Sequence, residues 1–378
     1  MTDIKLHIFS GSHYGVGVQQ GQAARSLIHE ALNRIPSFEF MKLMKPRLLP
    51  TSIFLALAKR RAAKLLANDI LRFYPKQTQR LEGVAEGAEL DVSTLLLMQS
   101  MELLIGTPSY QVQACTAFAL SAQRTSTKEA VVAKNFDYPN ELLSYQLTGR
   151  TKPNEGYQTL GCTMAPLPGM VDGMNEHGLT VTYNIASTTD KPENHAPLSM
   201  ALQEMLETCK TTDEAVKFIT KAKQGGHAAL LILADTENDL KAVEITPNHS
   251  ATREMTDGKV IHANHFLTQM QQFEIPHNAV YFGKTVSKEL IGTRIHESSE
   301  RRLKRAEELL KGKAKVDEDK VATVLRDHGE DNKPSMLTIC RHGKYASTLR
   351  SVIFYPKRKA IKVLYGNPCQ NEYVEFTF

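Results

Sequence analysis

Cys115 is the first candidate for a catalytic residue in this 378-residue chain. It opens the apolar run Cys115 to Ala122, and a second run, Ala130 to Tyr138, follows a polar turn and carries Asn135-Phe136-Asp137 near its end. Both runs have the composition of strands, so they predict a hairpin with Cys115 and Asp137 at the same end. A free cysteine is more often a buried core residue, and the hairpin by itself fits either role.

Thirteen histidines and five cysteines raise metal-dependent chemistry as an alternative. His262 and His265 are three residues apart, which suits two ligands on a helix, but their segment is typical of a strand end. Cys340 and His342 could share one face of a strand, yet the sequence shows no matching partner pair. We therefore predict no metal site, and a metal-assisted hydrolase built on His262, His265 and His342 is the alternative.

Several other classes lack sequence support. The chain has no G-x-G-x-x-G, no G-x-x-x-x-G-K-[ST] and no G-x-S-x-G, so dinucleotide binding, P-loop chemistry and nucleophile-elbow hydrolysis are not favoured. The cysteines are odd in number, scattered, and never in a C-x-x-C pair, which argues against a disulfide framework and a zinc finger. We predict no cofactor and at least one free thiol.

The charge balance does not demand a nucleic-acid partner, because 46 basic and 41 acidic residues leave a net charge of only +5. No apolar run is long enough to cross a bilayer, and the opening MTDIKLHIF lacks the pattern of a secretory signal. We therefore expect a cytoplasmic protein without a transmembrane segment.

The stretch Met41 to Arg80 is rich in Lys and Arg and has Asp69 as its single acid. Such a stretch could bind an anionic membrane surface, with Leu48, Leu49 and Ile53 to Leu57 as its apolar side. More often it is a helix pair that packs on its own domain and turns a basic face to water. We favour the helix pair.

Hydrophobic periodicity divides the chain at about residue 114. Residues 1–114 carry apolar residues at helical spacing, whereas residues 115–378 alternate strands with helices. The predicted helices are Gln19 to Leu32, Ser52 to Phe73, Leu95 to Leu104, Pro197 to Thr208, Thr212 to Lys223, Ser298 to Leu310 and Asp317 to Arg326. Further predicted strands are Leu179 to Ile185, Ala228 to Ala234, Lys241 to Ile245, Lys259 to Ala263, Met336 to Arg341, Thr348 to Tyr355, Ala360 to Tyr365 and Tyr373 to Phe378. Tight turns such as Asn175 to Gly178 indicate hairpins, so this α+β order predicts two antiparallel sheets packed together with helices outside.

A series of short motifs, taken in this order, resembles the N-terminal-nucleophile (Ntn) hydrolases of the penicillin acyltransferase type, peptidase family C45. Choloylglycine (bile salt) hydrolases and N-acylethanolamine acid amidases are the broader relatives. The motifs are Gly11 to Gly21, Gly83 to Glu102, Cys115-Thr116 with Asn135-Phe136-Asp137, Gly173 to Leu179 with Tyr183-Asn184, Asn264-His265-Phe266, Ser299-Glu300-Arg301-Arg302 with Arg305, Arg326-Asp327-His328, Ile339 to His342, and Gly366 to Cys369.

The resemblance implies a four-layer αββα sandwich in a chain that cuts itself between Ala114 and Cys115. The helical segment 1–114 would then be a propeptide or small subunit that stays associated with the catalytic domain 115–378. The new α-amino group, with a reference pKa near 8, could accept the thiol proton of Cys115 without a histidine. The implied activity is hydrolysis or acyl transfer on a linear amide through an acyl-Cys115 thioester, with a coenzyme A thioester only as an acyl donor.

The resemblance also implies roles for individual residues. Asn264 would stabilise the oxyanion, and Asp137 and Arg302 would form the charged pair around the α-amine. The further oxyanion or substrate-binding candidates are Asn184, Asn135, Lys134 and Asn175.

Two positions depart from the relatives. Lys134 stands where bile salt hydrolases keep an arginine, which argues against bile salts as substrates, and Ala114 stands where the acyltransferases usually have glycine. The motifs around His328, Cys340 and His342 match the family but have no evident task beyond structural support. A non-catalytic scaffold of the same fold is the remaining alternative.

Overall fold

The computed structural model describes residues 4–38, 45–46, 48–105, 114–225, 228–283, 286 and 290–378. The first part contains β1 (Leu6–Gly11), α1 (His13–Arg34), the 3₁₀ turn η1 (Ile35–Ser37), α3 (Thr51–Phe73), α4 (Pro75–Gly87) and α5 (Val92–Ile105). The second part begins with β2 (Ala114–Leu120), β3 (Val131–Pro139), the 3₁₀ turn η3 (Asn140–Tyr145), β4 (Gln146–Pro153), β5 (Thr159–Met164), β6 (Asp172–Asn175), β7 (Thr180–Ala186), α6 (Leu198–Thr208) and α7 (Thr212–Ile219). It ends with β8 (Ala228–Ala234), β9 (Leu240–Ile245), β10 (Ser250–Glu254), β11 (Lys259–His262), η4 (Gln269–Phe273), α8 (Glu297–Leu309), α9 (Glu318–Leu325), β12 (Ala346–Tyr355), β13 (Ala360–Tyr365) and β14 (Val374–Thr377).

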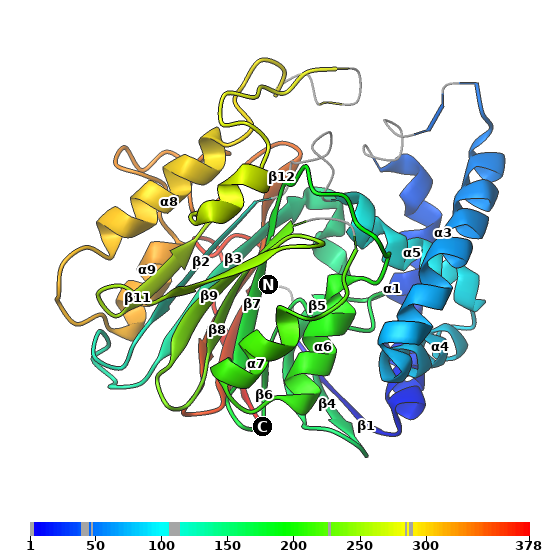
Figure 1. Ribbon diagram of the computed structural model, residues 1–378, viewed down its shortest axis with the longest axis horizontal. Helices are drawn as coiled ribbons and strands as arrows, with labels where there is room; N and C mark the ends of the chain where they lie inside the picture. The colour runs from blue at the N-terminus through cyan, green and yellow to red at the C-terminus, as the bar shows by residue number, and fades with distance from the viewer. Residues whose placement is uncertain are drawn as a thin grey trace.

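The strands form two sheets (Figure 1). One has eight strands in the order β1-β4-β5-β6-β7-β8-β9-β10, and the other has six in the order β11-β2-β3-β12-β13-β14. Neighbouring strands are antiparallel except β1 and β4, which pair in parallel. The predicted hairpins are present, because β2 pairs with β3 and the Asn175 to Gly178 turn joins β6 to β7.

Three buried apolar layers hold these elements together. The inner faces of both sheets meet through side chains such as Ala119, Val132, Ile232 and Phe354. The helices α8 and α9 cover the outer face of the six-stranded sheet, while α6 and α7 contact the eight-stranded sheet. Helices therefore lie outside both sheets, and the predicted α+β fold with four αββα layers is confirmed (Figure 1).

Glycines allow α1 and α4 to pack with their backbones in contact. A Cβ atom added to Gly17 would lie 2.1 Å from the Arg80 carbonyl oxygen, and one added to Gly83 would lie 2.1 Å from the Tyr14 carbonyl oxygen. Gly21 and Gly87 repeat the arrangement one turn later. Only glycine permits this approach, so the two N-terminal motifs of the sequence form one tightly packed helix pair.

A buried ion pair fastens the first part of the chain to the second. Arg80 of α4 donates to Glu207 of α6 at 2.6 Å, and both side chains are almost fully buried. Gln77 and Gln203 also donate to the Glu207 carboxylate, at 2.9 and 2.8 Å. Shared hydrogen bonds of this kind offset the cost of burying the two charges.

The structure also differs from the sequence prediction. Met336 to Arg341 is not a strand, because its backbone groups bond to other parts of the chain: Cys340 N–H donates to the Asp327 carbonyl, and the Ile339 carbonyl accepts from Asn135. The first part is not wholly helical either, since β1 extends the sheet of the second part. The strand β4 was not predicted, because its sequence QLTGRTKP is too polar to show the composition of a strand.

The basic segment is described only in part, since residues 41–44 and 47 lie outside the described ranges. The helix α3 buries Ala62, Leu66 and Ile70, whereas Ile53 and Leu57 are exposed. No helix within the described residues is both long enough and apolar enough to span a bilayer. Contact with a membrane surface stays an untested alternative to the favoured helix pair.

We expect Gly83→Ala to lower the free energy of unfolding by roughly 1–3 kcal/mol, because the new methyl group must push α1 away from α4. Urea unfolding followed by circular dichroism measures the change. Gly15→Ala is the control in α1, since its Cβ meets only the Ser12 hydroxyl, at 3.3 Å. Equal stability of the two variants would contradict the close packing.

Candidate active site

Cys115 lies within the buried apolar cluster that the N-terminal helices share with the second part of the chain. It is the second residue of β2, is buried, and faces Phe136 of β3 in the strand register. Ala114 faces Asp137, so the Ala114–Cys115 peptide bond lies within the paired strand. Directly opposed residues share a face of an antiparallel sheet, which places the Cys115 side chain beside Phe136 and places Asp137 on the opposite face.

Arg302 of α8 holds the backbone of the nucleophile strand from that opposite face. Its Nη1 donates to the Cys115 carbonyl oxygen and, at 2.9 Å, to Thr116 Oγ1. Its Nη2 donates to Asn264 Oδ1 at 2.8 Å, and its Nε donates to Ser298 Oγ at 3.3 Å. The N–H donors of the buried guanidinium thus connect α8 to β2 and to Asn264, and one of them also bonds within α8.

Asn264 follows β11 and contacts the backbone nitrogen of Cys115, next to Arg302. Its Oδ1 accepts from the Cys115 N–H at 2.8 Å, while its Nδ2 donates to the Ile185 carbonyl at 2.7 Å. Ser299 supports it, because the Ser299 hydroxyl accepts from the Asn264 N–H at 2.7 Å. Ser299 and Arg302 are one turn apart on α8, which explains the Ser-x-x-Arg spacing in the sequence.

Asp137 is a fully buried carboxylate with one side-chain donor. Thr348 Oγ1 donates to its Oδ1 at 2.7 Å, and Oδ2 has no hydrogen-bond partner among the described residues. Asp137 and Arg302 influence each other electrostatically, but the described contacts contain no ion pair between them within 4.0 Å. Arg302 instead directs its donors to Cys115, Thr116 and Asn264.

Burial dominates the proton affinities at this site. It raises the pKa of the Cys115 thiol to about 11, so the thiol is protonated at neutral pH while Ala114 is attached. Burial also raises the pKa of Asp137, against the positive charges of Arg302 and Arg341. It lowers the pKa of Arg302 to about 10, and the Asp137 charge acts in the opposite direction.

The other polar candidates lie near the nucleophile strand but make structural contacts. Lys134 is buried between the sheets, where it donates to Asp172 at 2.6 Å and to the Tyr183 carbonyl. Asn184 Nδ2 donates to the Ala263 carbonyl at 2.8 Å, next to Asn264. Asn184 thus helps to place the chain before Asn264.

The structure does not bring Asn135 or Asn175 to Cys115 in any described contact. Asn135 donates to the Leu325 and Ile339 carbonyls at 2.8 and 2.9 Å, which fastens α9 and the segment before β12 to β3. Asn175 donates to the carbonyls of Leu206 and Cys209 at 2.8 and 2.7 Å and holds the β6–β7 turn against α6.

The histidines of the metal-assisted alternative do not form a common site in the described structure. His262 is buried, and neither ring nitrogen has a described partner. His265 Nδ1 bonds to Ser299 Oγ at 2.6 Å. Among the described residues, His342 is grouped with His328, Cys340 and Cys369 instead.

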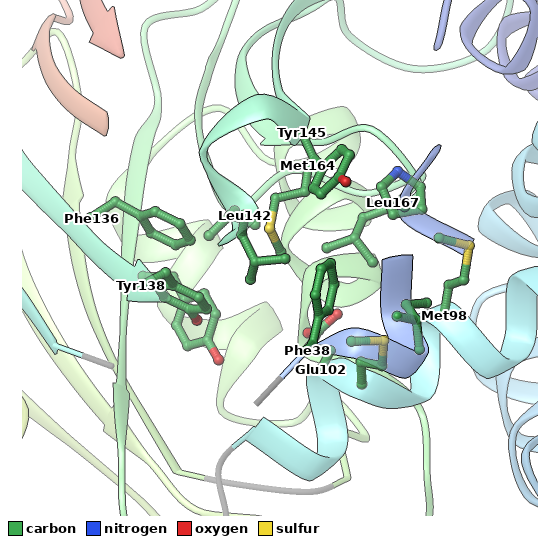
Figure 2. Close-up of a pocket in the computed structure, with 15 residues that line it drawn as sticks. Phe38, Met98, Glu102, Phe136, Tyr138, Leu142, Tyr145, Met164 and Leu167 are labelled. Atoms are coloured by element: carbon green, nitrogen blue, oxygen red, sulfur yellow. The ribbon is translucent and has the colours of Figure 1, made fainter. Parts of the chain in front are cut away.

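Two cavities border the β2–β3 hairpin, one beside β3 and the other beside Ala114. An apolar cavity of about 60 Å³ lies between β3 and the N-terminal helices, and Figure 2 shows Phe136 and Tyr138 on one side of it and Phe38, Met98 and Glu102 on another. The Cys115 side chain shares a sheet face with Phe136 and Tyr138. A polar cavity of about 360 Å³ is lined by residues that include Ala114, Asn264, Arg302 and Arg341.

Several residues of the site escaped sequence reasoning. Arg341 lines the polar cavity, and Thr348 Oγ1 bonds to both the Arg341 N–H and Asp137. The sequence pointed to Arg341 only through its position within the Ile339 to His342 motif. Glu102 is a buried carboxylate in the wall of the apolar cavity and accepts from Ser199 N–H and Oγ at 2.9 and 2.6 Å. Burial raises its pKa, and nothing in the sequence marked it as buried.

A family model described as acyl-coenzyme A:6-aminopenicillanic acid acyl-transferase matches residues 124–370, so the chain belongs to this family. The resemblance to the penicillin acyltransferase type is therefore confirmed.

Individual relatives are more distant. The chain is similar to the beta-alanyl-dopamine/carcinine hydrolase of Drosophila melanogaster, with 24% identity over 259 residues, which are 63% of this chain and 64% of the relative. The match thus spans less than two thirds of that relative's own length.

Similar solved structures come from three hydrolases. The Caenorhabditis elegans N-acylethanolamine-hydrolyzing acid amidase ortholog is 15% identical, with 64% of this chain and 93% of that chain covered and a TM-score of 0.42. A mutant conjugated bile acid hydrolase from Clostridium perfringens is 14% identical, with 70% of this chain and 97% of that chain covered and a TM-score of 0.45. A penicillin V acylase from Agrobacterium tumefaciens is 18% identical, with 66% of this chain and 83% of that chain covered and a TM-score of 0.41.

We expect Thr348→Val to lower the free energy of unfolding by roughly 1–3 kcal/mol, because it leaves Asp137 Oδ1 and the Arg341 N–H without their partner. The hydroxyl stabilises the ionised carboxylate, so its contribution is present above the pKa of Asp137 and lost as acid protonates the group. Urea unfolding over a series of pH values should show this loss growing as the pH rises through the pKa of Asp137.

Thr182→Val is the matched control for this change. Thr182 is also a buried strand residue, but its hydroxyl has no described partner. Its replacement should alter stability by less than about 0.5 kcal/mol. A loss of the same size in both variants would mean that the Thr348 hydroxyl does not support Asp137.

Proposed function

We propose that the chain is a cysteine amidohydrolase that activates itself by cleaving the Ala114–Cys115 bond and then hydrolyses linear N-acyl amides. The observation that carries the proposal is the position of Cys115, whose carbonyl is held by Arg302 and whose nitrogen is held by Asn264. Because both the nitrogen and the carbonyl of Cys115 are held, the reacting groups keep a fixed orientation, which favours reaction at this cysteine. Family membership supports the same assignment.

Self-cleavage would begin when Cys115 Sγ attacks the Ala114 carbonyl carbon. The C–N bond breaks, a thioester forms between Ala114 and Cys115, and the Cys115 nitrogen takes up a proton to become an amine. The thiol proton ends on this nitrogen, so the step balances without another proton acceptor. Asp137 lies on the opposite face of the strand and would act through its charge alone. Water then hydrolyses the thioester and separates residues 1–114 from residues 115–378.

The mature site would use the new α-amine as its base. Asn264 Oδ1 already bonds to this nitrogen, so the amine stays in place when the peptide bond is gone. The amine takes the thiol proton as Sγ attacks the substrate carbonyl, and it returns a proton to the leaving nitrogen. Water attacks the resulting acyl-Cys115 thioester, releases the carboxylic acid and restores the thiol.

Asn264 is also the proposed oxyanion donor. Its amide nitrogen carries two hydrogens, and the bond to the Ile185 carbonyl uses one of them. The second would be available to the tetrahedral intermediate. Asn264 would therefore combine two tasks, holding the base through Oδ1 and stabilising negative charge through Nδ2.

We assign the acyl group to the apolar cavity, because the Cys115 side chain shares a sheet face with two of its lining residues, Phe136 and Tyr138. A volume of about 60 Å³ suits a short acyl group better than a long fatty chain. The polar cavity beside Ala114 would receive the amine portion and the water. The Drosophila relative is named for a beta-alanyl substrate, whose acyl group is short.

The two cleavage fragments would remain one enzyme. Phe38, Met98 and Glu102 from the first fragment and Phe136 and Tyr138 from the second line the same cavity. The cycle uses no cofactor. A primary amine that reaches the thioester before water would turn hydrolysis into acyl transfer, and a coenzyme A thioester could serve as an acyl donor.

Purified wild-type protein should contain a fragment that begins at Cys115, whereas Cys115→Ala should remain a single chain. Intact-mass spectrometry distinguishes the two. Brief incubation of the cleaved protein with a short-chain acyl anilide should add the acyl mass to Cys115. Cys209→Ser is the control, because Cys209 is buried in a different place and should not affect cleavage or activity. An uncut wild-type chain with full amidase activity would overturn self-activation.

Asn264→Asp separates the two proposed tasks of Asn264, because it keeps an acceptor for the amine but removes the oxyanion donor. We expect both Asn264→Asp and Asn264→Ala to lower kcat on a short N-acyl amide by on the order of 10² or more. Steady-state kinetics on fully cleaved protein measures the effect. Retention of wild-type kcat by Asn264→Asp would exclude the donor role.

A further inference from the structure

Three motifs without an assigned task meet at one place beside the six-stranded sheet. His328 follows α9, Cys340 and His342 precede β12, and Cys369 follows β13. Each offers one ligand atom, and all four atoms lie within 4.8 Å of one another. The sequence showed only the Cys340 and His342 pair, and the fold supplies the partners that were missing.

The distances fit tetrahedral coordination. His342 Nε2 lies 3.4 Å from Cys340 Sγ and 3.3 Å from Cys369 Sγ. A zinc ion with bonds of about 2.3 Å to sulfur and about 2.0 Å to nitrogen separates its ligand atoms by roughly 3.3 to 3.8 Å. No two of the four ligand atoms are more than 4.8 Å apart, so side-chain movements of about 1 Å would complete the tetrahedron.

The surroundings of the cluster also resemble those of a metal site. His328 Nε2 is buried without a described hydrogen-bond partner, while its Nδ1 lies 3.4 Å from Asn332 Oδ1. A metal-binding histidine commonly has this arrangement, with one nitrogen on the ion and the other on an oxygen that orients the ring. Asn367 Nδ2 lies 3.9 Å from Cys340 Sγ, where it can donate to a thiolate.

We propose that His328, Cys340, His342 and Cys369 bind one zinc ion as a Cys₂His₂ site. Two thiolates and two neutral imidazoles balance the charge of Zn²⁺, and binding releases the two thiol protons. Mixed sulfur and nitrogen ligands in a tetrahedron select zinc over magnesium, calcium or manganese. All four positions are filled by protein, so the ion is structural and is not a catalyst.

The proposed ion would fix the segment that carries Arg341. Arg341 lies between two ligands, lines the polar cavity and accepts through its carbonyl from Asn367 at 2.7 Å. Its N–H bonds to Thr348, the residue that donates to Asp137. Zinc would therefore hold one wall of the polar cavity without touching Cys115. This inference does not depend on the proposed amidase activity.

Metal analysis of the full-length protein, purified without a histidine tag or chelator, tests the proposal. We expect about one zinc ion per chain. Replacement by cobalt(II) should give the visible bands of a tetrahedral complex and a thiolate-to-cobalt charge-transfer band. A chain that holds neither metal after reconstitution under reducing conditions would overturn the site, as would a stable Cys340–Cys369 disulfide, detected as the loss of two hydrogens from the intact mass.

Two variants assign the ligands. Cys369→Ser and His328→Ala should each lose most of the bound zinc and the cobalt spectrum, and Cys369 is exposed enough for its replacement to leave the fold intact. Cys209→Ser changes a cysteine outside the cluster and should keep one bound zinc ion per chain. Circular dichroism shows whether each variant is folded. If a variant unfolds, the presence or absence of the tetrahedral cobalt spectrum in the wild-type protein tests the proposed site. Full zinc retention by both folded ligand variants would overturn the assignment.

Discussion

The buried guanidinium of Arg302 is the interaction on which the site depends. It joins α8 to the first residues of β2 and to Asn264, so one side chain sets the positions of three separate segments. A fully buried cation is costly unless its donors are used and a counter-charge is near. Cys115, Thr116, Asn264 and Ser298 supply acceptors, and Asp137 supplies the charge. The loss of any of these partners would leave part of the cation unsatisfied.

The sheets explain why these groups meet. In the β2–β3 pair, Ala114 lies opposite Asp137, and the alternation of side chains sends Cys115 to one face and Asp137 to the other. Cys115 thus lies on the same face as Phe136, whereas Asp137 lies on the face that α8 and α9 cover.

Much of this arrangement was predictable from local patterns. The hairpin around Cys115 and Asp137 followed from strand composition, and the helix with Ser299 and Arg302 followed from its spacing. The Met336 to Arg341 segment has strand composition as well, but its hydrogen bonds go to side chains such as Asn135 and to distant loops, and composition does not encode such partners. The parallel β1–β4 pair and the burial of Glu102 likewise depend on long-range contacts.

The parallel pairing of β1 with β4 has a consequence for aggregation. β1 is the outermost strand at one end of the eight-stranded sheet, and without it β4 would become the edge strand. Exposed edges of this kind pair readily with strands of other molecules. With residues 6–11 in place this edge is a strand of six residues, whereas a chain made without them would end its sheet in the eight-residue β4 and expose a longer edge to its neighbours.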